Sequence, residues 1–303
     1  MQKRCATVLI FALLAALCCG CAPKDPLDTA LAKTESYYQN TEIVIGADAL
    51  SPCFARLGRT GWQDGYRASV LAVLEDGEIP GALATDYARV VLGLTAAGFD
   101  ARNLDGHDLT APLASMEFVR HQGLNGVVWT LLALDSGGYD PSGGDTSRDA
   151  LLAAILEFQL PDGGFAYSGT DADPDMTAMV LQALAPYRDQ PPVDAAVDTA
   201  LGTLAAIQDA DGGYSSWGTA SCESCAQVLL ALCALELAPD DARFVRDGST
   251  VLDAMLCYQQ RDGGFSHIAG GDTDASATAQ AYSALLALQR QRDGGGRFYD
   301  FTD

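Results

Sequence analysis

One short pattern, Gln-x-x-Asp-Gly-Gly followed by an aromatic residue, occurs three times in the second half of the chain. Its glutamines are separated by 49 and then by 51 residues. A nearly constant spacing of this size is typical of a repeated supersecondary unit that buries its apolar faces against its neighbours. The positions that define the repeat are Gln159, Phe165, Gln208, Tyr214, Gln259 and Phe265.

Each repeat has two helical segments around its glycine pair. The first segment precedes the glutamine and reads DALLAAILEFQ, AVDTALGTLAAIQ or STVLDAMLCYQ. The glycine pair ends it, because glycine adopts the left-handed conformation that terminates helices. After a loop, the second segment reads DMTAMVLQALAPY, ESCAQVLLALCAL or SATAQAYSALLAL, and it is apolar around most of its circumference. We therefore expect the second helices to be buried in an inner layer and the more polar first helices to form an outer layer.

The first half of the chain carries weaker copies of this arrangement, and no segment alternates as a half-buried strand would. Together with the three clear pairs, these copies predict twelve helices, six outer and six inner. The expected fold is all-α, with residues 30–303 closed into a single α/α toroid. The additional helices are expected to begin near Leu27, Glu42, Asp64, Asp86, Thr110 and Asn125.

The first twenty residues have the features of an export signal. Lys3 and Arg4 precede a short apolar run, and the sequence LCCGC follows it. Small residues before a cysteine resemble a bacterial lipobox, so we expect residues 1–20 to be a signal peptide and Cys21 to be lipidated. Residues 21–29 would then be a tether, which places the protein on the outer face of the cytoplasmic membrane. An ordinary cleaved signal of a secreted protein and a poorly cleaved anchor remain alternatives.

The charge of the chain excludes some partners. It has 40 acidic and 18 basic residues, and its net charge is −22. Removal of Lys3 and Arg4 would bring this charge to −24. Such a chain repels the phosphates of nucleic acids and the surface of an anionic membrane. We therefore expect no nucleic acid partner and membrane attachment by a lipid anchor only, while the oligomeric state stays open.

The three repeats resemble those of the terpenoid cyclase and protein prenyltransferase superfamily of α/α toroids. In the squalene-cyclase branch the repeat carries Gln and Trp, whereas Phe165, Tyr214 and Phe265 occupy the aromatic position here. The resemblance implies that the glutamine and the aromatic residue join neighbouring helices and are structural. The segment from about residue 30 onward is also similar to toroid domains of exported proteins from Gram-positive bacteria.

The same resemblance points to a proton-donating site in the stretch DADPDMTAM. Squalene-type cyclases carry D-x-D-D before Thr-Ala, and here the matching positions are Asp173, Pro174, Asp175 and Met176. Asp175 would be the proton donor, with Asp173 beside it, but methionine replaces the last aspartate. Capping is the competing interpretation, because Asp173 before Pro174 suits a helix N-cap. In that case the helix dipole favours an ionised Asp175.

Polar residues also begin the other inner helices, which predicts a polar ring at one mouth of the toroid. Long loops join the helices there, and Trp217 on one of them offers a stacking surface. This mouth is our candidate ligand site, although every buried helix needs a cap and the ring could serve only that purpose. The candidate binding residues are Asp175, Trp217, Glu223, Asp272, Asp274 and Ser276.

The sequence offers only incomplete metal sites. Glu223-Ser224-Cys225 resembles the Asp-x-Cys zinc ligands of protein prenyltransferases, but the histidine that should follow near residues 276–278 is missing. The spacing of Asp171, Asp173 and Asp175 resembles an EF-hand without its glycine and its final glutamate. We expect no metal and no cofactor.

Four cysteines of the second half form two pairs with different contexts. Cys222 and Cys225 lie one helical turn apart and could form a local disulfide or remain thiols. Cys233 and Cys257 lie in apolar helical runs and are expected to be buried.

The leading interpretation is a non-catalytic binding module at the cell surface, for an apolar or amphipathic small molecule or a surface protein. One alternative is a divergent class II terpene cyclase that uses Asp175. The other is a purely structural interaction domain. A dry aromatic lumen would favour the cyclase, a polar open lumen would favour binding, and a lumen filled by side chains would favour the structural domain.

Overall fold

The computed structural model describes residues 25–302. The expected signal peptide, the lipidation site at Cys21 and residues 21–24 of the expected tether lie outside the described residues. Among the described helices, none combines the length and the hydropathy needed to cross a membrane.

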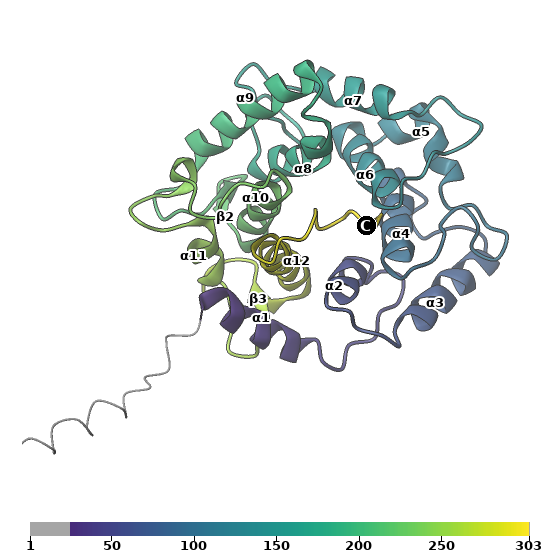
Figure 1. Ribbon diagram of the computed structural model, residues 1–303, viewed down its shortest axis with the longest axis horizontal. Helices are drawn as coiled ribbons and strands as arrows, with labels where there is room; N and C mark the ends of the chain where they lie inside the picture. Colours follow the sequence, from purple (N-terminus) through teal and green to yellow (C-terminus); the bar gives the residue numbers. More distant parts are fainter. Residues whose placement is uncertain (1–24, 303) are drawn as a thin grey trace, which may run out of the picture.

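Twelve α-helices of the described chain form two concentric rings (Figure 1). Each inner helix contacts the next inner helix, and α12 contacts α2, so the inner ring is closed. The predicted toroid of six outer and six inner helices is confirmed. The outer helices are α1 (Pro26–Tyr37), α3 (Gln63–Glu75), α5 (Met116–Arg120), α7 (Arg148–Glu157), α9 (Pro191–Ile207) and α11 (Val251–Leu256). The inner helices are α2 (Leu50–Arg56), α4 (Ala84–Ala96), α6 (Gly123–Ser136), α8 (Pro174–Leu184), α10 (Cys222–Ala234) and α12 (Ala275–Arg292).

The difference in burial between the layers follows the sequence pattern. The inner helix α10 buries ten of its thirteen residues, whereas the outer helix α3 buries two of thirteen. Small residues such as Ala226 and Ala231 are fully buried in α10, where they allow its neighbours to approach closely. The apolar circumference of the second helices therefore reflects contact on nearly all sides.

Two predicted helix starts are wrong. No helix begins near Glu42, because the β-branched run from Ile43 to Ile45 leads into a turn in which Gly46 has a φ of 92°; α2 begins at Leu50. Near Thr110, a 3₁₀ turn (Ala111–Ala114) comes first, and α5 begins only at Met116.

Two short hairpins were not predicted. One pairs β1 (Ser215–Ser216) with β2 (Thr219–Ala220), and the other pairs β3 (Phe265–Ser266) with β4 (Thr273–Asp274). These strands have two residues each, which is too short for an alternating pattern to be visible in the sequence.

The repeat glutamines join each unit to the next. The Nε2 atom of Gln208 donates to the carbonyl oxygen of Gly212 in its own loop at 2.8 Å and to that of Phe244 in the following unit at 2.9 Å. Gln259 donates to the carbonyl oxygen of Ala30 in α1 at 3.0 Å. The last repeat is thus bound to the first helix, and this contact closes the outer ring.

Replacing Gln208 with alanine is expected to lower the free energy of unfolding by about 2 kcal/mol, because two buried carbonyl groups lose their donor. Urea unfolding followed by circular dichroism measures this change. Gln190→Ala is the matched control, because the Gln190 side chain makes no hydrogen bond to other described residues and does not cap α9. Equal effects of the two substitutions would contradict a joining role for the repeat glutamine.

Candidate ligand-binding site at the mouth of the inner ring

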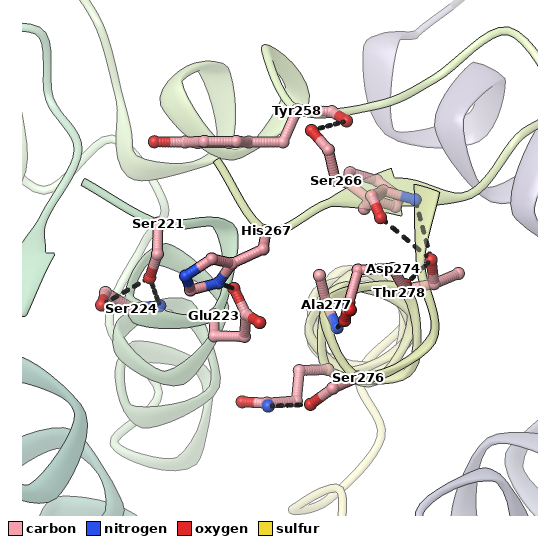
Figure 2. A network of polar contacts seen from close by, with 12 residues as sticks. Ser221, Glu223, Ser224, Tyr258, Ser266, His267, Asp274, Ser276, Ala277 and Thr278 are labelled. Atoms are coloured by element: carbon pink, nitrogen blue, oxygen red, sulfur yellow. Dashed lines mark hydrogen bonds and ion pairs between the residues drawn. The ribbon is translucent and has the colours of Figure 1, made fainter. Parts of the chain in front are cut away.

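The loops that lead from outer to inner helices gather at one end of the toroid. We call this end the mouth and define it by residues 166–175, 215–224 and 266–276. Figure 2 shows part of it, with His267 between the first turns of α10 and α12. The mouth therefore combines three segments that are about fifty residues apart in the chain.

Asp173 is the N-cap of α8. Its Oδ1 atom accepts a hydrogen bond from the backbone N–H of Met176 at 2.9 Å, and Pro174 occupies the first helical position. The hydroxyl of Ser216, on β1, donates to its Oδ2 atom. The cap predicted from the sequence is present, and both carboxylate oxygens of Asp173 are used in structural contacts.

Asp175 is in a different environment. Its Oδ1 atom is buried and has no hydrogen-bond partner among the described residues. Burial raises the pKa of Asp175 to about 6, and the nearby carboxylates of Asp173 and Glu223 act in the same direction, whereas a hydrogen bond with Ser224 and the proximity of His267 lower it. This shift is opposite in direction to the effect expected of the helix dipole, and its largest cause is desolvation.

Glu223 pairs with a histidine that the sequence analysis did not select as a binding residue. The Nδ1 atom of His267 lies 2.9 Å from Glu223 Oε2, and the Glu223 side chain is 16% exposed against 55% for His267. The backbone carbonyl of His267 also accepts from the N–H of Cys222, at the start of α10, at 3.0 Å. The β3–β4 hairpin thus positions His267 over the first turn of α10.

The three candidate residues of the last repeat have different environments. Asp274 is the N-cap of α12, where its Oδ1 atom accepts from the N–H of Ala277 at 2.8 Å. Ser276 is exposed in the first turn, and Asp272 is exposed in the loop between β3 and β4. The hydroxyl of Ser276 accepts from Gln280 Nε2 at 3.1 Å.

A chain of amide side chains crosses three inner helices below the mouth. Gln182 Nε2 donates to Gln227 Oε1 at 2.9 Å, and Gln227 Nε2 donates to Gln280 Oε1 at 2.8 Å. Sequence reasoning missed this chain, although a signal exists. Gln227 lies four residues after Glu223, Gln280 lies four after Ser276, and Gln182 lies seven after Asp175, so each shares a helical face with a mouth residue. The surface beneath the mouth is therefore polar.

Large apolar side chains are exposed around the mouth. Trp217 is 75% exposed at the turn of the first hairpin, with a φ of 53°, Tyr167 is 67% exposed and Ile268 is 45% exposed. The two other exposed large apolar residues of the described chain are Val44 and Leu83, and they also lie just before inner helices. Trp217, which was selected from the sequence, is thus one of several exposed apolar side chains around the mouth. Tyr167 and Ile268 were not selected.

The cysteines of the described chain are free thiols. Cys222 and Cys225 are both buried, and burial raises the pKa of Cys225 to about 12. Cys233 is buried as predicted, but the expectation for Cys257 is wrong, because it is exposed near the end of the short outer helix α11. Among residues 25–302, no group of three or more His, Cys, Asp or Glu side chains is arranged to hold a metal ion.

Part of the chain is similar in sequence to known proteins. Residues 106–295 match the prenyltransferase alpha-alpha toroid domain family. A drimenyl diphosphate synthase from Streptomyces showdoensis is 30% identical over 158 residues, which are 50% of this chain and 29% of that protein. The corresponding enzyme from Streptantibioticus cattleyicolor is 32% identical over 157 residues, 49% of this chain and 28% of that protein. The chain thus matches less than a third of the length of these relatives.

Solved structures with the same architecture are more distant in sequence. A protein from Actinoplanes has a TM-score of 0.56 at 14% identity, over 88% of this chain and 99% of that one. The unsaturated glucuronyl hydrolase of Bacillus sp. GL1 has the same TM-score and identity, over 90% and 98%. These likenesses concern the fold alone. From the match over residues 106–295, the chain belongs to the prenyltransferase alpha-alpha toroid domain family.

Proposed function

We propose that the mouth binds an amphipathic small molecule, as part of an exported and lipid-anchored protein. The observation that carries the proposal is the buried, unpartnered Oδ1 atom of Asp175 in the mouth, whose loops also carry the exposed side chains of Tyr167, Trp217 and Ile268. An unpaired buried acceptor costs free energy, and exposed aromatic side chains gain free energy when they are covered. A ligand with an apolar body and one hydroxyl or amino group satisfies both.

The neighbouring groups set the polarity of this ligand. Asp175 and Glu223 both present carboxylate oxygens, and the amide chain through Gln227 lies one helical turn below Glu223. A donor at the polar end of the ligand would pair with Asp175, while the apolar part would lie against Trp217 and Tyr167. Such a division between a few polar anchors and an apolar contact surface is usual for small-molecule sites.

The test is native mass spectrometry of the protein with squalene, an isoprenoid diphosphate, a corrinoid and an envelope lipid extract. We expect a bound ligand whose affinity falls about tenfold or more in Asp175→Asn and in Trp217→Ala. The control is Asp189→Asn, which changes an exposed aspartate in the turn between α8 and α9, at the other end of the toroid. If no probe binds, or if all three variants bind as the parent does, the proposal is wrong and a structural interaction domain is favoured.

A second candidate function is cyclisation of an isoprenoid by protonation. The raised pKa of Asp175, its D-x-D spacing from Asp173 and the similarity to drimenyl diphosphate synthases favour it. Two observations argue against it. A polar amide chain lies below the mouth, and the buried Met176 takes the place of the last aspartate of the motif. Gas chromatography of the same incubations separates the two functions. A cyclised product that is lost in Asp175→Asn would establish catalysis, whereas an intact bound ligand without product supports binding.

A further inference from the structure

A cavity lies at the end of the toroid opposite the mouth. Its volume is about 240 Å³, and it is lined by the C-terminal ends of α6, α8 and α10 together with residues 297–302. An apolar cavity of about 150 Å³ is sufficient for benzene. The space is therefore large enough for a molecule of two fused rings.

One wall of this cavity is the segment after α12. Figure 1 shows this segment running from α12 across the opening of the inner ring toward α4. The guanidinium of Arg56 donates from Nε to the carbonyl oxygen of Phe298 at 2.8 Å and from Nη2 to that of Arg297 at 3.0 Å. The N–H of Phe301 donates to the carbonyl oxygen of Ser136 at 2.8 Å, and Arg56 lies 4.1 Å from the centre of the Phe301 ring. The segment is thus bound to both α2 and α6.

The charges around the cavity compensate one another. Asp135 accepts from Arg148 Nε at 3.0 Å and from the hydroxyl of Tyr187 at 2.9 Å. Arg297 Nη2 donates to Asp300 Oδ2 at 2.9 Å. A ligand with a net charge would find no unpaired opposite charge among these groups, and its desolvation would oppose binding.

The remaining lining is mostly apolar, with spare hydrogen-bond donors. Leu132, Ala183, Leu230 and Phe298 contribute apolar surface. A guanidinium has five N–H donors, and the bond to Asp300 uses only part of those of Arg297. We propose that this cavity is a second ligand site, which takes a neutral and mainly apolar molecule with one hydrogen-bond acceptor. The cavity and the mouth lie at opposite ends of the inner helices, and Gln182, which lines the cavity, belongs to the amide chain below the mouth.

Calorimetric titration with 1-naphthol, a neutral two-ring probe, tests the proposal. We expect binding of 1-naphthol, and binding of 1-naphthalenesulfonate that is weaker by about tenfold or more, because the second probe carries a charge on the same ring system. Ala183→Phe should abolish 1-naphthol binding by filling the cavity, and circular dichroism checks that this variant is folded. 1-Naphthol also has the apolar body and the hydroxyl proposed for a ligand of the mouth, so the titration is repeated with Trp217→Ala. Binding at the cavity should persist in this variant, whereas any binding at the mouth should be weakened.

Cysteine alkylation locates the probe without a substitution. Cys233 lines the cavity and is 9% exposed, and burial raises the pKa of its thiol to about 12, so it should react slowly with N-ethylmaleimide. Bound 1-naphthol should slow this reaction further, while the exposed Cys257 reacts at an unchanged rate as an internal reference. Absence of 1-naphthol binding, or binding that leaves the Cys233 rate unchanged, would overturn the proposal.

Discussion

Replacing Gly263 with alanine is expected to lower the free energy of unfolding by about 3 kcal/mol or more. Gly263 belongs to the glycine pair of the last repeat and has a φ of 97°, a conformation that costs a residue with a Cβ roughly 1–2 kcal/mol. The added Cβ would also lie closer than 3.0 Å to the carbonyl oxygen of Lys33, which is backbone and cannot rotate away. Helix α1 would therefore have to move.

Movement of α1 would disrupt the closure of the outer ring. The hydroxyl of Thr34, in α1, donates to the carbonyl oxygen of Gly263 at 3.0 Å, and Gln259 binds Ala30 one turn earlier. Loss of these buried hydrogen bonds adds to the steric and conformational terms. Gly263→Ala therefore tests the contact between α1 and the last repeat as well as the glycine itself.

Urea unfolding of two alanine variants isolates this contact. Gly270→Ala changes a glycine with a φ of 74° whose added Cβ would meet no described atom within 4 Å, so only the backbone term of roughly 1–2 kcal/mol is expected. The difference between Gly263→Ala and Gly270→Ala measures the clash with α1. If the two variants unfold with equal free energies, the ring is not tightly closed at this point.

Asp175→Asn is expected to raise the free energy of unfolding at pH 7 by roughly 1–3 kcal/mol. The pKa of Asp175 is raised from 3.8 to about 6 by burial, so between these values the native state binds more protons than the unfolded state. Stability is therefore highest below about pH 4, falls as the pH rises toward 6, and stays reduced above it. Asparagine resembles the neutral acid in shape and removes this penalty.

Unfolding in urea at several pH values between 4 and 7.5 measures the effect. The parent should lose stability between about pH 4 and 6 relative to Asp175→Asn, and the two should converge at the acidic end. Asp189→Asn, at an exposed position, should change stability by less than about 0.5 kcal/mol at every pH. A difference between parent and Asp175→Asn that does not vary with pH would show that Asp175 titrates normally.

The two expected consequences of Asp175→Asn have opposite signs. The substitution should stabilise the fold and, under the proposed function, weaken ligand binding. A buried carboxylate that reduces stability is typical of a functional site. Asp173 differs in this respect, because its cap stabilises α8.

The sequence alone determined the architecture and the helix starts that depend on neighbouring residues. The spacing of Gln159, Gln208 and Gln259 indicated the repeat, and the apolar circumference of the second helices separated the inner from the outer layer. Asp173 before Pro174 correctly predicted the N-cap of α8, since capping involves only the next few residues. Where local signals conflicted, as in the β-branched run after Glu42, the predicted helix was wrong.

Only the tertiary structure decided the chemistry of the mouth and of the cavity at the opposite end of the inner helices. The pKa of Asp175 depends on burial and on Glu223 and His267, which lie on other segments and reach it only in the closed ring. The contact of Arg56 with the backbone of Arg297 joins residues 241 positions apart, and it forms one wall of the second cavity. Desolvation and cavity shape depend on which distant segments pack together, and hydrophobic periodicity does not specify those neighbours.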